Sequence, residues 1–209
     1  MNKIPITSPI TIAMTGASGS LYGLRLLECL FDAKENVNLM ISPAGLMVIN
    51  SETDLQLSAR PHETHQQLVE HFKISNEQLR VFGHQQWTAP FASGSNPPKA
   101  FVICPCTNGT LASISNGLSR NLIERTADVV LKEQRKLIVV HRETPLSIIQ
   151  LENMLKLARA GATIMPANPA FYHRPQKVEE IIDFMVARIL DHLAISHDLS
   201  ARWGNGINL

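Results

Sequence analysis

The chain has 209 residues, a length that fits one domain with a substantial core more easily than two small domains. Hydrophobic residues make up 44% of it and charged residues 18%, a globular balance that excludes a long disordered tail. Its 19 basic and 18 acidic residues nearly cancel, so no net field attracts nucleic acid or an anionic membrane, and local groups must hold any anionic ligand.

Strand-like and helix-like patterns alternate along the chain. In chain order they predict a strand at 9–14, a helix at 21–31, a strand at 37–41, the start of a helix at 45–51, a polar and weakly helical stretch at 54–86, a loop rich in Ser, Gly and Pro at 88–98, a strand at 100–104, helices at 109–115 and 121–132, a strand at 136–140, a helix at 148–160, a strand at 162–165 and a long helix at 178–193. Strands that alternate with helices imply an α/β fold, with a parallel, right-handed, doubly wound sheet in three layers.

The N-terminal segment and the cysteines indicate the compartment. The first residues lack the apolar core of a signal peptide, and no apolar run approaches the roughly 20 residues that span a bilayer. Cys29, Cys104 and Cys106 are an odd number without disulfide-scaffold spacing, which suits a reducing compartment. We therefore expect one cytoplasmic domain over residues 1–209. We expect no metal site, because Cys104 and Cys106 are isolated from other ligands.

The loops after the predicted strands are the first candidates for a site, because open α/β sheets bind ligands beyond the carboxyl ends of their strands. Small residues at 15–20 let backbone N–H groups approach an oxyanion, although no dinucleotide or Walker motif is present. Ser42 and the hydroxyls and amides of residues 104–110 follow two further strands. Together these groups suit a phosphate and a flat heterocycle. Alternatively, each hydroxyl is only a helix cap.

Charged residues follow the predicted strand at 136–140 and occupy the helix after residue 120. Arg142 and Glu143 are placed to meet a ligand, with an ordinary surface ion pair as the alternative. Arg125 and Lys132 are seven residues apart and share a helix face, where salt bridging is the default.

The C-terminal third offers two further candidates. Arg188 lies at the edge of the apolar stripe of the last predicted helix, where a snorkelling arginine is the alternative to a ligand-binding one. Tyr172 lies in a loop stiffened by three prolines, and such rigidity lowers the entropy cost of binding.

Seven short motifs occur in order over nearly the whole chain: Thr15-Gly16-Ala17-Ser18-Gly19, Ser51-Glu52-Thr53-Asp54, Ala92-Ser93-Gly94-Ser95, Cys104-Pro105-Cys106, Ala127-Asp128-Val129-Val130-Leu131-Lys132-Glu133, Arg142-Glu143-Thr144-Pro145 and Phe171-Tyr172-His173-Arg174-Pro175. Together they closely resemble the UbiX/Pad1 family of flavin prenyltransferases. The first motif alone is weak, whereas the last two at this distance are specific.

This resemblance implies a flavodoxin-like fold and a homododecamer with sites at subunit interfaces. The family joins a dimethylallyl group from dimethylallyl monophosphate to N5 and C6 of reduced FMN, making the prenylated flavin used by UbiD-type decarboxylases. The resemblance assigns the substrate phosphate to Tyr172 and Arg188, assisted by Lys132 and Arg125. It assigns FMN contacts to Gly16, Ala17, Ser18, Ser42, Thr107, Asn108, Gly109, Thr110 and Arg142.

The chemistry of such a transfer agrees with these residue types. Breaking an allylic C–O bond needs charge stabilisation on the departing phosphate, which preorganised Arg, Lys and Tyr donors provide without a metal. Glu143 and Glu52 are the candidate bases for removing the C6 proton, with Ser18 as a relay. Trp203 is a candidate cover for the allyl group that stabilises cationic character through its face, and a plain interface anchor is the alternative.

Two other functions compete with this interpretation. The first is an FMN-dependent decarboxylase of the cysteine-decarboxylase type, which has a Pro-Ala-Ser-Ala-Asn-Thr loop where this chain has residues 104–110. The second is a noncatalytic FMN-binding subunit of a decarboxylase. Pure binding would not need Glu52, Glu143, Lys132, Tyr172 and Arg188 together, so the sequence favours the transferase.

Overall fold

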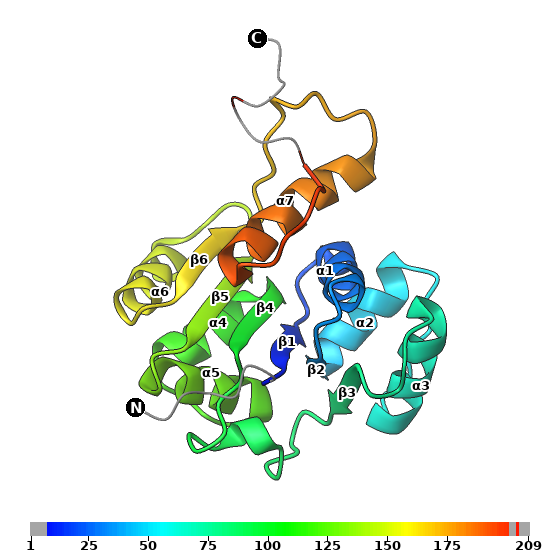
Figure 1. The fold of residues 1–209 in the computed structure, drawn as a ribbon. Helices are drawn as coiled ribbons and strands as arrows, with labels where there is room; N and C mark the ends of the chain where they lie inside the picture. Colours follow the sequence, from blue (N-terminus) through cyan, green and yellow to red (C-terminus); the bar gives the residue numbers. More distant parts are fainter. Residues whose placement is uncertain (1–7, 201–203, 205–209) are drawn as a thin grey trace.

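The fold is a six-stranded parallel sheet between two helical layers, seen in a computed structural model that describes residues 8–200 and 204 (Figure 1). The sheet order is β3-β2-β1-β4-β5-β6. The strands are β1 (Ile10–Met14), β2 (Val37–Ile41), β3 (Leu79–Phe82), β4 (Ala100–Cys106), β5 (Lys136–His141) and β6 (Thr163–Pro166).

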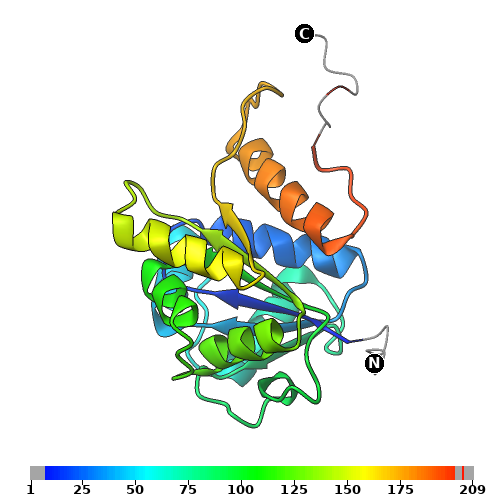
Figure 2. The same cartoon turned by 90° about the vertical axis from the view of Figure 1, so that its left-hand side faces the viewer.

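Helices cover both faces of the sheet (Figures 1 and 2). They are α1 (Ser20–Asp32), α2 (Pro43–Glu52), α3 (Pro61–Phe72), α4 (Asn108–Ser115), α5 (Leu122–Lys132), α6 (Ile148–Arg159) and α7 (Val178–Leu193), with a short 3₁₀ turn η1 (Pro90–Ala92). One core cluster joins the sheet to α1, α2, α3 and α7, and a second joins it to α4, α5 and α6. The expected three-layer, doubly wound architecture is confirmed.

The central strands are apolar because both of their faces are covered. All residues of β1 and β4 are buried, as a parallel sheet between two helical layers requires. The chain leaves β1 toward β2 through α1 on one face, and leaves β4 toward β5 through α4 and α5 on the other. The connections therefore diverge between β1 and β4, and open α/β sheets bind ligands at such a switch point, beyond the carboxyl ends of the strands.

Two predicted boundaries differ from the structure in an informative way. The stretch 54–86 contains α3, as its weak helical pattern suggested, but it also contains the strand β3, which the sequence analysis missed. This edge strand has only four residues, and only Leu79 is fully buried, so its apolar signal is short. The strand predicted at 100–104 continues to Cys106, where the pairing with β5 shifts register after Ile103.

In the part of the chain that the structure describes, no helix is long and apolar enough to cross a membrane.

Candidate functional site

Thr15 ties together the loops that follow β1 and β4. Its hydroxyl donates to the carbonyl of Pro105 at 2.9 Å and accepts from the backbone N–H of Thr107 at 2.9 Å. The side chain is 2% exposed, so both bonds lie in a dry environment where breaking them is costly. These hydrogen bonds therefore hold the loops after β1 and β4 together at the switch point of the sheet.

The first loop also packs closely against the start of α2. A Cβ built on Gly16 would lie 2.4 Å from the Cβ of Ala44, and one on Gly45 would lie 2.5 Å from the carbonyl oxygen of Met14. Both values are below any real contact, so glycine is required at these two positions. This close approach brings Ser42 beside the first loop.

Glu52, at the end of α2, caps the N-terminus of α1. Its Oε2 accepts from the backbone N–H groups of Gly19 at 3.0 Å and Ser20 at 2.8 Å, and from the Ser20 hydroxyl at 2.7 Å. Burial opposes ionisation, but hydrogen bonds from Ser18, Ser20 and Gly19 outweigh it and hold the pKa of Glu52 below its ordinary value. The backbone N–H groups at the start of α1 are therefore paired with a carboxylate of the protein itself.

Ser42 and Thr107 are helix caps, the alternative that the sequence left open for both. The Ser42 hydroxyl accepts from the Gly45 N–H at 2.9 Å at the start of α2. The Thr107 hydroxyl accepts from the Thr110 N–H at 3.2 Å and donates to the Thr110 hydroxyl at 3.0 Å at the start of α4. The N-termini of α2 and α4, where the helix dipoles are positive, therefore lie at the carboxyl edge of the sheet.

The carboxyl end of β5 carries a polar cluster next to α4. Asn108 contacts His141 through its Oδ1, at 2.7 Å from Nε2, and donates through its Nδ2 to Glu143. The backbone N–H of Thr144 donates to the other Glu143 oxygen at 3.1 Å. Arg142 lies between these residues in the chain, and its Nε is buried without a hydrogen-bond partner. The cluster can therefore offer both a held carboxylate and an unused cationic donor.

Tyr172 packs against α7, the helix that carries Arg188. The Tyr172 ring lies 5.8 Å from the Phe184 ring in an edge-on contact, and Arg188 follows Phe184 by one helical turn. The Arg188 guanidinium pairs with Asp191 at 2.7 Å, and 51% of its side chain is exposed. Both predicted phosphate ligands are thus connected to α7, Arg188 within it and Tyr172 through its contact with Phe184.

Arg125 and Lys132 lie on the opposite face of the sheet from Tyr172 and Arg188. They belong to α5, which packs with α4 and α6, whereas α7 packs with α1. Arg125 pairs with Asp128 at 2.7 Å and Lys132 with Glu133 at 2.5 Å, so the default of salt bridging holds here. Within one protomer, the four predicted phosphate ligands form two separate pairs.

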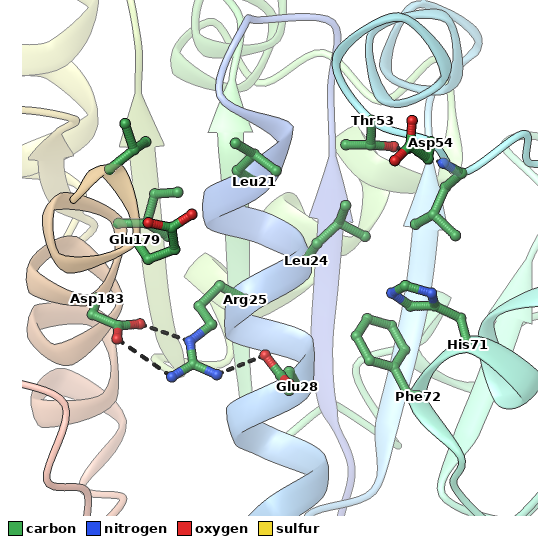
Figure 3. Close-up of a pocket in the computed structure, with 13 residues that line it drawn as sticks. Leu21, Leu24, Arg25, Glu28, Thr53, Asp54, His71, Phe72, Glu179 and Asp183 are labelled. Carbon is green, nitrogen blue, oxygen red and sulfur yellow. Dashed lines mark hydrogen bonds and ion pairs between the residues drawn. The ribbon is translucent and has the colours of Figure 1, made fainter.

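An ion pair holds α7 against α1 beside a cavity of about 640 Å³ (Figure 3). Arg25 of α1 contacts Asp183 of α7 at 2.6 Å and Glu28 at 2.6 Å, and the hydrogen bond to Asp183 is the main cause that raises the pKa of Arg25. None of the predicted site residues lines this cavity. The ion pair between Arg25 and Asp183 joins α1 to α7, the helix that carries Arg188.

A smaller cavity of about 330 Å³ has Ser42 in its wall, together with Phe82 and His84 at the end of β3. Burial lowers the pKa of His84, against the raising effect of the Glu124 charge, and so favours its neutral form. No sequence pattern predicted a role for His84, which lines this cavity with Ser42, or for His141, which contacts Asn108. The position of His141 directly before Arg142, a predicted site residue, was the signal in the sequence that could have identified it. Trp203 lies outside the described residues.

Comparison with known proteins gives consistent matches over most of the chain. The Flavoprotein family model matches residues 5–190. Flavin prenyltransferase UbiX of Pseudomonas aeruginosa is 54% identical over 195 residues, 93% of each chain. The structure of AnUbiX (PadA1) in complex with FMN and dimethylallyl pyrophosphate is 37% identical with a TM-score of 0.83, and the match covers 95% of this chain and 98% of that one. A dodecameric FMN-dependent UbiX-like decarboxylase from Escherichia coli O157:H7 is 34% identical with a TM-score of 0.83, covering 94% and 100%.

Proposed function

Because this chain belongs to the flavin prenyltransferase UbiX family of flavoproteins, we propose that it joins the dimethylallyl group of dimethylallyl monophosphate to N5 and C6 of reduced FMN. The product would pass to a UbiD-type decarboxylase. The enzyme is thus a transferase for which FMN is a prenyl acceptor. We also propose a cytoplasmic location, supported by the three free thiols, which a reducing compartment keeps unpaired.

Arg142 is the observation that carries the FMN assignment. Its Nε is buried at the carboxyl end of β5 without an acceptor, and a buried donor without a partner costs free energy that a bound oxygen would remove. The N-termini of α2 and α4 begin at the same edge and favour an anionic group. The proposed FMN contacts are Gly16, Ala17, Ser18, Ser42, Thr107, Asn108, Gly109, Thr110 and Arg142.

We propose that the substrate phosphate lies between two copies of the chain. Tyr172 and Arg188 of one copy would supply one side, and Arg125 and Lys132 of a second copy would supply the other. The separation of these pairs on opposite faces of one protomer supports this arrangement, as does the dodecameric relative. We therefore propose a homododecamer with its sites at subunit interfaces.

Fixed cations would replace a metal in this reaction. Arginine and lysine N–H groups stabilise the charge that develops on the departing phosphate, and Tyr172 adds a neutral donor. The described residues contain no group of three His, Cys, Asp or Glu side chains placed to hold a metal ion. We expect turnover to survive EDTA, and loss of turnover that magnesium restores would contradict the metal-free mechanism.

Glu143 is our preferred base for the C6 proton, and Glu52 acting through Ser18 is the alternative. Glu52 already accepts several hydrogen bonds and its pKa is lowered, so it has little tendency to take a proton. Glu143 accepts one side-chain and one backbone donor. The products formed by Glu143→Gln and Glu52→Gln should distinguish the two candidate bases. The variant that lacks the true base should transfer the prenyl group without closing the fourth ring.

We assign Trp203 to the cover of the allyl group, where its face would stabilise developing positive charge. Trp203→Leu should slow prenyl transfer and leave FMN binding intact. If Trp203→Leu impaired subunit assembly as much as the rate, Trp203 would instead be only an interface anchor.

A single reaction tests the proposed function against its competitors. Purified protein is mixed with FMN, a reductant and dimethylallyl monophosphate, and the flavin is examined by absorbance and by mass. The prenyltransferase should yield a flavin that has gained one five-carbon unit. An unchanged flavin with carbon dioxide release from a carboxylic acid would indicate a decarboxylase, and an unchanged flavin without turnover would indicate a noncatalytic binding subunit.

A further inference from the structure

The Asn108 amide is held from both sides, which sets its orientation. Its Nδ2 lies next to a Glu143 oxygen, and its Oδ1 lies 2.7 Å from the Nε2 of His141. A carboxylate only accepts hydrogen bonds, so the amide NH₂ group must face Glu143. The amide oxygen therefore faces the imidazole.

This orientation also fixes the tautomer of His141. An amide oxygen only accepts, so the Nε2 that faces it must carry the hydrogen. His141 is 2% exposed, and burial, the largest cause, lowers its pKa, which favours the neutral ring. The neutral ring with a hydrogen on Nε2 is then the state that satisfies the cluster.

The other neighbours of His141 do not compete with its contact to Asn108. Its register neighbours are Cys106 on β4 and Pro166 on β6, and burial raises the pKa of the Cys106 thiol so that it stays neutral. The charged groups that act on the imidazole are Glu143, which raises its pKa, and Arg142, which lowers it. Both follow His141 directly in the chain.

We propose that His141 is a positioning residue that locks the Asn108 amide, so that its NH₂ group holds the Glu143 carboxylate in place for proton removal. The proposal rests on the proposed function for its catalytic consequence, and on the described hydrogen bonds for its geometry. His141 touches neither substrate in this scheme. It acts through Asn108, which links the end of β5 to the start of α4.

The first test needs no flavin and no turnover. Nitrogen-15 solid-state spectra of the ligand-free protein would be compared with those of His141→Gln, so that the missing signals identify His141 among the eight histidines. We expect a neutral ring with its hydrogen on Nε2 at neutral pH. The opposite tautomer would overturn the proposal, because Nε2 would then have no hydrogen to donate to the amide oxygen.

The second test measures kcat and KM at saturating FMN. His141→Leu should lower kcat by about tenfold, equivalent to about 1.4 kcal/mol of transition-state stabilisation, with little change in the KM for dimethylallyl monophosphate. His141→Gln should recover most of this loss, because its amide nitrogen can donate in place of Nε2. His62→Leu, on the exposed surface of α3, is the matched control and should leave both constants unchanged.

A double variant decides whether His141 acts through Asn108. In an Asn108→Ala background, His141→Leu should cause no further loss of kcat. Additive losses, an unchanged kcat in His141→Leu alone, or failure of His141→Gln to recover activity would each overturn the proposal. Absence of a prenylated product from the unsubstituted protein would instead refute the proposed function, and the tautomer measurement would still stand on its own.

Discussion

The start of α1 and the end of β5 lie at the same edge of the sheet, but they differ in whether their polar groups have hydrogen-bond partners. At the start of α1, the backbone N–H groups of Gly19 and Ser20 are already paired with the Glu52 carboxylate. At the end of β5, the Nε of Arg142 is buried without a partner. The chain therefore pairs the first set of donors itself and leaves the Arg142 donor unpaired.

This difference distinguishes polar groups that stabilise the fold from polar groups that can still bind a ligand. A buried donor that the protein satisfies contributes to folding, whereas one left unsatisfied costs stability until a ligand supplies its acceptor. The start of α1 should therefore respond to mutation mainly through stability, and the end of β5 mainly through affinity. The following predictions test that division, in order of decreasing effect.

Loss of the Arg142 side chain should have the largest effect, on FMN affinity. A charge-assisted hydrogen bond is worth about 1.5 to 3 kcal/mol, so Arg142→Leu should weaken FMN binding roughly ten- to a hundredfold in a titration. Arg135→Leu is the matched control, because Arg135 also has a buried, unpartnered Nε but precedes β5 at its amino end. Equal losses in both variants would mean that the unpaired donor does not mark the site.

Loss of the Arg188 side chain should act on the second substrate. The side chain is half exposed and already paired with Asp191, so the effect should be at the low end, about tenfold in the dependence of rate on dimethylallyl monophosphate. Tyr172→Phe should change the same parameter. FMN affinity should hardly move in either variant. Normal substrate dependence in both, or a parallel loss of FMN binding, would refute the proposed phosphate pocket.

Truncation of Glu52 should destabilise the fold. Removing a side-chain cap from a helix costs about 1 kcal/mol, so Glu52→Ala should lower the free energy of unfolding by about that amount in urea. Ser51→Ala, one position earlier and exposed, should change it much less. A stability equal to that of the unsubstituted protein would show that the cap contributes nothing to folding.

The pH dependence of this cap should be the smallest effect. Because the folded-state pKa of Glu52 is lowered, its contribution is complete above the ordinary value of 4.5 and declines as the pH falls below it. The stability difference between the unsubstituted protein and Glu52→Gln should therefore shrink on acidification. A stability difference that grew at low pH would have the wrong sign.

The sequence predicted the layers because burial leaves a local trace. The runs that became β1 and β4 are continuously apolar, and the stripe of α7 repeats with helical spacing. β3 escaped prediction because a four-residue edge strand with one fully buried residue has no comparable pattern.

The strand-end rule located the candidate site, but the pairing of its residues depends on tertiary contacts. Glu52 lies 33 residues from Gly19, and Asn108 lies 33 residues from His141. No local pattern in the sequence predicts that the first pair forms a helix cap, or that the second sets a tautomer. Composition gave the kinds of groups present, and the fold decides which of them are already engaged.

The division of the four proposed phosphate ligands between opposite faces of the sheet has a genetic consequence. If each pocket takes Arg188 from one copy and Lys132 from another, two inactive variants can complement each other. Mixed assemblies of Arg188→Leu and Lys132→Leu chains would contain some pockets in which both residues are intact. Two defective alleles could then restore growth together where neither does so alone, which a protein with self-contained sites would not allow.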